Sequence, residues 1–199
     1  MMVTRVLVAV AAVAGLFAAG SGAALAAPAA AAVSRFDDGS FEYPTAPANA
    51  FTTVTAGQPI GPWKVTSGAV DLIGAGFWQA AEGDQSVDLN AGQAGAVAQT
   101  FSTTAGRTYT VTYALAANPA GGPAVKSGRA LVDGQNFQDF TFDSTGKTFA
   151  AMGYVQRQFT FVAGGSTTTL AFASTVSGPY GPVIDDVRVE TCRPCSCAK

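Results

Sequence analysis

Two-residue alternation of apolar and polar side chains constrains this chain to β-structure over much of its length. In residues 108–115 the aromatic and aliphatic side chains share one face, and the threonines share the other. Residues 154–162 and 168–172 repeat the pattern, which in a strand turns one face to a core and the other to water or a ligand. Helical periodicity is absent after the first 26 residues, so the fold is predicted to be all-β.

Turn-forming residues divide the chain into short segments. Asp133-Gly134 lies between strand-like runs at 126–132 and 135–142, and Asp-Gly is typical of a two-residue type I′ hairpin. Residues 44–62 form the longest stretch without a clear strand, and we expect them to wrap an edge of a sheet. The runs number about ten, which predicts a β-sandwich in one domain.

The N-terminus has the pattern of a secretory signal peptide. Arg5 precedes a long apolar run, and Ala24-Leu25-Ala26 has the small residues of a cleavage site. A membrane anchor is the alternative, although the run is rich in Ala and Gly and weakly apolar. The expected organisation is a signal peptide at 1–26, a disordered N-terminus at 27–35, a β-sandwich at 36–190 and a cysteine-containing tail at 191–199. The mature protein would be secreted or held at the cell surface, with no transmembrane segment.

The tail holds all three cysteines of the chain, Cys192, Cys195 and Cys197. An odd number leaves at least one thiol free or paired with another molecule. The tail therefore predicts either a local disulfide with one free thiol, or a disulfide-linked partner. A zinc site is a third alternative from the spacing of Cys192 and Cys195, but it lacks a fourth ligand.

Composition excludes several classes of function. The chain has no histidine, which excludes Ser-His-Asp, Cys-His and imidazole–zinc chemistry. Charged residues make up 12% of the chain and its formal net charge is −2, so no nucleic-acid partner is expected. Glu82, Asp84 and Asp88 leave glycoside hydrolysis by paired carboxylates as an alternative. Glu82-Gly83-Asp84 is more simply a solvated turn, and the protein is predicted not to be an enzyme.

Aromatic and carboxamide side chains are the candidate ligand-binding residues. Trp63, Phe77 and Trp78 offer rings on which the C–H faces of a sugar can pack, and Gln79 offers an amide for its hydroxyl groups. Tyr180 lies between two Gly-Pro pairs that should hold its loop off the sheet. The alternatives are that both tryptophans belong to the core and that Tyr180 is a packed loop tip.

A calcium site is predicted where the first and last strands meet. In the last strand, Asp185 shares a face with Val187 and Val189, and this face is expected to point into the core. Glu42 is expected on a first strand beside the last one, so Glu42 and Asp185 would converge, with Asp186 next to them. Carboxylates with loop carbonyls suit calcium. The alternative is that Asp185 hydrogen-bonds to backbone while Asp186 is solvated.

A set of longer motifs carries a family resemblance. They are Gly39-Ser40-Phe41-Glu42, Asp71-Leu72-Ile73, Phe77-Trp78-Gln79-Ala80-Ala81, Gly83-Asp84-Gln85-Ser86-Val87-Asp88-Leu89-Asn90, Gln99-Thr100-Phe101, Asn118-Pro119, Asp139-Phe140-Thr141-Phe142 and Gly181-Pro182-Val183-Ile184-Asp185-Asp186-Val187. The chain resembles the bacterial choice-of-anchor C family, which is similar to the plant cell-wall proteins of domain-of-unknown-function family 642. The cysteine tail is a departure, because it matches no sorting signal.

The resemblance implies a fold, a location and a ligand class. The fold would be a galactose-binding-like jelly-roll β-sandwich, secreted and associated with the cell surface. Plant relatives are linked to pectin and to pectin methylesterase, which implies binding of a pectin-like or other wall polysaccharide. Related jelly rolls hold a structural calcium between a first-strand Glu and a last-strand Asp, which correspond here to Glu42 and Asp185.

Two hypotheses from different classes follow. The first is a non-catalytic carbohydrate-binding module, supported by Trp78, Gln79 and the nearly neutral polar surface. The second is a structural or adhesive surface protein, cross-linked or anchored through its cysteine tail.

Overall fold

The structure is a computed structural model that describes residues 35–191. The predicted signal peptide at 1–26, most of the expected disordered N-terminus, and Cys192, Cys195 and Cys197 lie outside the described residues. Between residues 35 and 191 the regular structure consists of strands, and no helix there has the length and hydropathy needed to cross a membrane.

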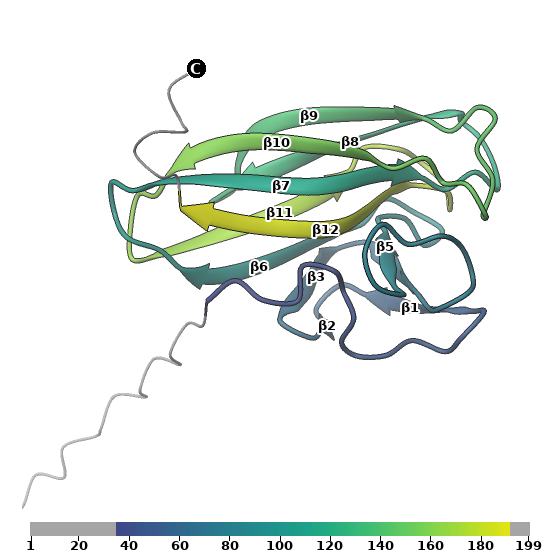
Figure 1. The fold of residues 1–199 in the computed structure, drawn as a ribbon, viewed down its shortest axis with the longest axis horizontal. Coiled ribbons are helices and arrows are strands. Elements are labelled where there is room, and N and C mark those ends of the chain that lie inside the picture. The colour runs from purple at the N-terminus through teal and green to yellow at the C-terminus, as the bar shows by residue number, and fades with distance from the viewer. Residues whose placement is uncertain (1–34, 192–199) are drawn as a thin grey trace, which may run out of the picture. The chain divides into compact units, whose positions relative to one another are not determined.

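In this part of the chain, strands form two antiparallel sheets of six strands each (Figure 1). Sheet A has the order β1-β4-β5-β12-β7-β10, and sheet B has the order β2-β3-β6-β11-β8-β9. The bounds are β1 Phe51–Thr55, β2 Pro59–Ile60, β3 Trp63–Ser67, β4 Ala69–Ile73, β5 Ser86–Asp88, β6 Ala96–Ser102, β7 Thr108–Ala117, β8 Val125–Val132, β9 Gln135–Asp143, β10 Val155–Val162, β11 Thr167–Ser174 and β12 Pro182–Thr191. The predicted all-β jelly-roll sandwich is confirmed.

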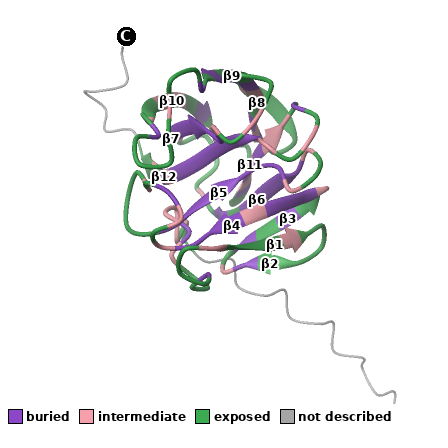
Figure 2. Ribbon diagram, turned by 90° about the vertical axis from the view of Figure 1, so that its right-hand side faces the viewer, coloured by how far each residue is buried: buried purple, intermediate pink, exposed green. Residues whose placement is uncertain are grey.

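The core fills the space between the two sheets. Central strands of both sheets are buried along much of their length, whereas the edge strands are largely exposed (Figure 2). In β7, Tyr109, Val111, Tyr113 and Leu115 are buried, and the threonines between them are half-buried on the outer face. The alternation in the sequence therefore predicted the inner and outer faces of this strand correctly.

The predicted Asp133-Gly134 hairpin joins β8 to β9. Asp133 and Gly134 have φ angles of 49° and 79°, as a type I′ turn requires, and Val132 pairs with Gln135 across it. The turn fixes the first two pairs of β8 and β9, and the register then shifts at a bulge between Ala130 and Leu131.

Two predictions about the N-terminal part were wrong. Residues 44–62 contain β1 and β2, which are the edge strands of sheets A and B. These strands are short and β1 is rich in exposed threonine, so their sequences do not show the alternation of apolar and polar residues that predicts a strand. Glu42 lies outside any strand, since the first strand begins at Phe51. The preceding segment does meet the last strand, where Val187 N donates a 2.8 Å hydrogen bond to Gly39 O.

A β-bulge in β12 reverses the predicted orientation of Asp185. Ile184 pairs with Leu115 and Val189 pairs with Val111, and the register shifts between Asp185 and Arg188. One extra residue in the bulge lets Ile184 and Val189 both face the core although they are an odd number of residues apart. Asp185 therefore lies on the outer face of sheet A, opposite to the face that the alternation predicted.

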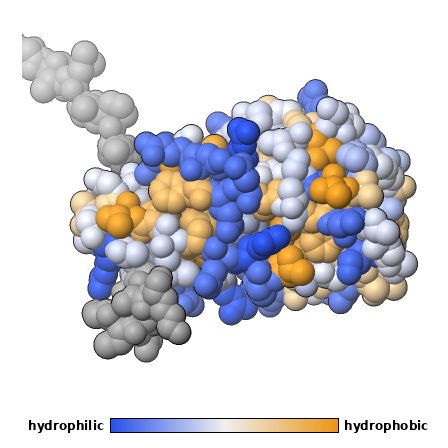
Figure 3. Space-filling view, turned by 90° about the horizontal axis from the view of Figure 1, so that it is seen from above, coloured by the Kyte–Doolittle hydropathy of each residue, from blue (hydrophilic) through white to orange (hydrophobic). Residues whose placement is uncertain are grey.

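Side chains bridge the two edge strands β9 and β10. Gln138 Nε2 donates to Gln158 O at 3.1 Å, and Arg157 Nη2 donates to Thr141 O at 3.2 Å. On the face seen from above in Figure 3, hydrophobic surface is divided into separate patches by hydrophilic side chains. Bonded edge carbonyls and divided apolar surface both disfavour extension of a sheet into a second molecule.

Candidate functional site

Four aromatic side chains, which we call the aromatic cluster, come together at the edge of sheet A: Phe51 at the start of β1, and Phe77, Trp78 and Phe149 on loops. The centroid of the Phe77 ring lies 5.5 Å from that of Phe51 and 5.3 Å from that of Phe149. Trp78 lies 5.4 Å from Phe77 and 5.8 Å from Phe149. Phe51 and Phe149 are 47% and 38% exposed, whereas Trp78 is 6% exposed. The cluster thus presents two phenylalanine rings to solvent over a buried tryptophan.

Gln79 ties the loop between β4 and β5 to the turn that carries Phe149. Its backbone N–H donates to Phe149 O at 2.8 Å, and its side-chain Oε1 accepts from Met152 N at 3.0 Å. The turn itself is closed by Thr148 and Ala151, which exchange backbone hydrogen bonds. Gln79 is exposed, so it both fixes Phe149 and places a carboxamide beside the ring.

The Asp185 carboxylate accepts hydrogen bonds from the backbone in the middle of the same loop. Its Oδ2 accepts hydrogen bonds from Ala81 N at 2.7 Å and Glu82 N at 3.1 Å, and its Oδ1 accepts from Asp186 N at 2.6 Å. The residue is fully buried, and burial raises the pKa of Asp185 to about 7, while the three amide donors act in the opposite direction.

Glu42 holds the far end of the loop. Its Oε1 accepts hydrogen bonds from Asp84 N at 2.8 Å and Gln85 N at 2.9 Å. Gly83 is required at the turn, because its φ is +62° and a Cβ there would lie 2.3 Å from Glu42 Oε1. Together, Asp185 and Glu42 fix the acidic turn that the sequence predicted.

A polar groove of about 340 Å³ lies on the outer face of sheet A. It is lined by Thr112 of β7, Gln156, Arg157 and Gln158 of β10, and Asp186 and Arg188 of β12. Asp186 has a φ of 45° at the bulge, an uncommon conformation for a residue other than glycine. This conformation places the Asp186 carboxylate 2.8 Å from Arg188 Nε and 3.5 Å from Gln156 Nε2.

The loop between β4 and β5, which carries Phe77 and Trp78, approaches the polar groove at Glu82. Asp185, whose carboxylate holds Ala81 and Glu82, is followed directly by Asp186 of the groove. The hydrogen bond to Asp186 raises the pKa of Arg188, and the negative charge of Glu82 acts in the same direction. The loop that carries Phe77 and Gln79 therefore leads to one end of the groove.

The predicted calcium ligands serve other hydrogen bonds in the structure. Glu42 and Asp185 both accept backbone N–H groups of one loop, and Asp186 pairs with Arg188. Amide donors aimed at a carboxylate offset its charge without a cation, and they occupy oxygens that calcium would need. Within residues 35–191, no three His, Cys, Asp or Glu side chains are grouped to hold a metal ion. The donor set thus does not favour calcium here, and a calcium site stays a prediction.

The five predicted ligand-binding residues differ in burial and lie in different parts of the structure. Trp63 is 1% exposed, packs against Phe41 and donates its indole N–H to Asp38 O, so its prediction as a ligand platform was wrong. Trp78 is also buried and donates to Ser86 Oγ at 2.8 Å, so its ring supports the aromatic cluster instead of facing solvent. Burial in the core was the alternative for both tryptophans.

Tyr180 lies on a different loop from the aromatic cluster. Its half-buried ring packs on Gly121, where a Cβ would lie 2.2 Å from the ring. The backbone next to it is held by a 3.0 Å hydrogen bond from Gly181 N to Asp88 Oδ1. Tyr180 therefore lies at a packed loop tip, which was the alternative to a ligand-binding role. Of the predicted set, half-buried Phe77 belongs to the aromatic cluster and exposed Gln79 lies beside it.

Several residues of the site were not predicted. Gln156, Gln158 and Thr112 had a usable signal, because they alternate with apolar residues on strands whose polar face was expected to meet water or a ligand. Phe51 and Phe149 had none, because each lies far in the chain from Phe77 and only the folded loops bring their rings together.

Comparisons with known proteins point to one family and several similar folds. A family model described as "Protein of unknown function (DUF642)" matches residues 34–190. The chain is similar to a family 35 carbohydrate-binding module from Clostridium thermocellum, with 15% identity, a TM-score of 0.48, and coverage of 71% of this chain and 99% of the module.

Two further solved structures show a comparable likeness. A family 61 carbohydrate-binding module in complex with β-1,4-galactotriose has 18% identity and a TM-score of 0.48, over 66% of this chain and 90% of that one. A xylan-binding domain from Paenibacillus barcinonensis has 14% identity and a TM-score of 0.48, over 76% and 100%. At these identities and TM-scores, no functional residue is carried over from these proteins.

Proposed function

This chain belongs to the DUF642 family, and we propose that it is a non-catalytic carbohydrate-binding module that acts outside the cell. The observation that carries the proposal is the aromatic cluster, with Phe51 and Phe149 exposed, on the same sheet as an open groove lined by carboxamide, hydroxyl and charged groups. Sugar rings pack their C–H faces on aromatic rings, and their hydroxyl groups exchange hydrogen bonds with Asn, Gln and Thr side chains. One extended site can therefore meet both needs of a polysaccharide chain.

The charge of the groove supports a ligand without high net charge. Arg188 and Asp186 form an ion pair within it, so their charges offset each other, and Arg157 adds a single positive charge to the lining. Gln156 and Gln158 are exposed on the same strand and can both donate and accept. A methyl-esterified wall polysaccharide of the pectin type, or another neutral hydroxyl-rich glycan, fits this chemistry, and its binding would depend little on salt.

The absence of histidine from the chain also supports a binding role. Of the three carboxylates considered for glycoside hydrolysis, Glu82 and Asp84 lie on the exposed turn, and Asp88 is buried. Asp88 accepts hydrogen bonds that hold two loops in place. These roles account for the carboxylates without chemistry on a sugar.

Isothermal titration against pectic and other wall polysaccharides tests the proposal. Phe149→Ala is expected to weaken binding about tenfold or more, as truncation of an interface anchor does. Phe137→Ala is the matched control, because Phe137 is 42% exposed but lies on β9, outside the aromatic cluster. Equal affinities for the two variants would refute the site. Failure of the wild type on every glycan, with disulfide-linked oligomers on a non-reducing gel, would favour the structural role instead.

A further inference from the structure

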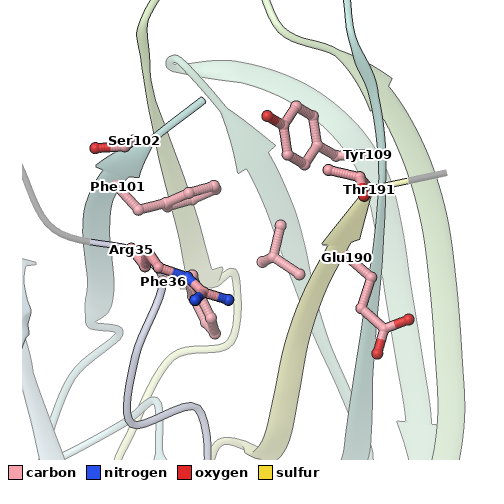
Figure 4. A pocket seen from close by; sticks show the side chains of 8 residues that line it. Arg35, Phe36, Phe101, Ser102, Tyr109, Glu190 and Thr191 are labelled. Atoms are coloured by element: carbon pink, nitrogen blue, oxygen red, sulfur yellow. The ribbon is translucent and has the colours of Figure 1, made fainter. Parts of the chain in front are cut away.

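A second pocket, which we call the end pocket, has a volume of about 460 Å³ (Figure 4). It opens between the sheets where β6 ends, β7 begins and β12 ends. Its lining consists of Arg35, Phe36, Phe101, Ser102, Tyr109, Val189, Glu190 and Thr191. None of these residues belongs to the aromatic cluster or the polar groove. The end pocket is therefore a separate site.

Buried Phe101 and Tyr109 form the floor of the end pocket, and partly exposed Phe36 and Val189 face its interior. Phe36 meets Phe101 edge-on, with centroids 5.4 Å apart and planes at 83°, and it is only partly buried against the core. Tyr109 stacks on Phe161 at 5.4 Å, which fixes its ring at the opposite wall. Val189 of β12 also lines the pocket and is partly buried against the core. A pocket of this size with such walls suits the ring of a small molecule.

The Arg35 guanidinium is the charged group that faces the end pocket. The Arg35 side chain reaches into the pocket, whereas the Glu190 carboxylate points away from it (Figure 4). Glu190 follows the inward-facing Val189 on β12, and its charge raises the pKa of Arg188 on the outer face. Within residues 35–191 the ion pairs join Arg129 to Asp139 and Arg188 to Asp186, so no described carboxylate pairs with Arg35.

We propose that the end pocket binds a small aromatic carboxylate, with its ring against Phe36 and Val189, above the floor of Phe101 and Tyr109, and its carboxylate on Arg35. A guanidinium group matches a carboxylate with two parallel N–H donors, and this pairing is stronger next to apolar walls than in water. Aromatic walls favour a flat ring, which can stack or meet their edges. A ligand with only one of the two features loses part of the binding.

Chemical-shift titration of the purified protein with three probes tests the proposal. Benzoate carries both features, benzamide lacks the charge, and acetate lacks the ring. Benzoate is expected to bind about tenfold more tightly than either of the others, because benzamide loses the charge-assisted hydrogen bonds to Arg35 and acetate loses the ring contacts with the walls. The shifts should centre on the backbone amides of Ser102, Tyr109 and Val189.

Two arginine variants separate a specific site from general attraction of anions. Arg35→Gln is expected to remove the preference for benzoate over benzamide. Arg107→Gln is the matched control, because Arg107 is exposed on the turn after β6 but does not line the end pocket. It should keep the preference. Circular dichroism confirms that both variants fold.

Several results would overturn the proposal. They are equal affinity for benzoate and benzamide, an unchanged preference in Arg35→Gln, or displacement of benzoate by a neutral monosaccharide. The proposal is independent of the function at the aromatic cluster, since polysaccharide binding should be the same in Arg35→Gln as in the wild type.

Discussion

Asn118 donates a hydrogen bond of 2.8 Å from its side-chain amide to the buried carboxylate of Asp88. Asp88 Oδ1 also accepts from Asn90 N at 2.9 Å and from Gly181 N at 3.0 Å. Asp88 therefore joins β5 to two loops, those that follow β7 and precede β12. Burial raises the pKa of Asp88 to about 7, and the hydrogen bonds, led by that of Asn118, act in the opposite direction.

Stability is expected to rise as the pH falls from 8 to 5. The pKa values of Asp88 and Asp185 are both raised to about 7 in the folded state from an ordinary value of 3.8. The folded protein binds these protons more tightly than the unfolded chain. The resulting stabilisation is fully present below the ordinary value and is lost as the pH rises through about 7. Each carboxyl is expected to contribute about 1–3 kcal/mol over this interval.

Urea denaturation at pH 5, 6, 7 and 8 measures this effect. Asp88→Asn is the control, because it removes this titration and keeps an oxygen for Asn90 N and Gly181 N. Its amide would face the Asn118 donor and lower stability at every pH, so the comparison is of the slope of stability with pH. About half of the pH dependence should disappear in this variant. A free energy of unfolding that is constant or increases from pH 5 to pH 8 would show that the two carboxylates are ionised in the folded state throughout.

The sequence predicted the fold well where alternation and turn chemistry acted together. The polar and apolar faces of β7 and the Asp133-Gly134 hairpin follow directly from local physics. The bulge in β12 could not be read in this way, because the left-handed conformation of Asp186 adds a residue without changing the pattern of apolar side chains. The error at Asp185 follows from that one residue.

The site was harder to predict than the fold. Tryptophan is large enough to serve either a core or a ligand, and its local sequence does not distinguish the two. In the fold, the loop carrying Phe77 and Trp78 turns the tryptophan inward to Ser86 and leaves the outer surface to Phe149. Such a choice depends on contacts between distant segments, which the local pattern of residues does not encode.

Chelation distinguishes two accounts of Glu42 and Asp185. In the first account, the two carboxylates stabilise the loop by accepting hydrogen bonds from the backbone N–H groups of Ala81, Glu82 and Asp84. These hydrogen bonds need no cation, so excess chelator should leave the melting temperature unchanged. Differential scanning fluorimetry with and without chelator measures this. A clear fall in the melting temperature that is absent from Asp185→Ala would instead support structural calcium at these residues.

Trp78 is expected to affect stability more than binding. Trp78→Ala empties a buried site and should lower the free energy of unfolding by about 3–5 kcal/mol. Trp78→Phe keeps a ring but removes the hydrogen bond to Ser86 Oγ, and it should cost about 1 kcal/mol. Chemical denaturation measures both. A Trp78→Phe variant of normal stability that no longer binds polysaccharide would make Trp78 a direct ligand contact.

Gln79 is expected to control the affinity of the aromatic cluster through Phe149. Gln79→Ala removes the acceptor of the Met152 N–H and should loosen the turn that carries the exposed ring. The loss of stability should be about 1 kcal/mol, the contribution of one neutral hydrogen bond. Polysaccharide affinity should fall severalfold, because the ring must then be ordered on binding.

Gln79→Glu separates this positioning role from direct contact with a sugar. The carboxylate keeps an acceptor for Met152 N but loses the amide donor, so a positioning role predicts stability and affinity close to those of the wild type. Hydrogen exchange at the Met152 amide gives a readout that a sugar contact would not change, and it should be faster in Gln79→Ala alone. If Gln79→Glu binds as poorly as Gln79→Ala while the Met152 amide stays protected, the Gln79 amide contacts the ligand itself, and the positioning role is wrong.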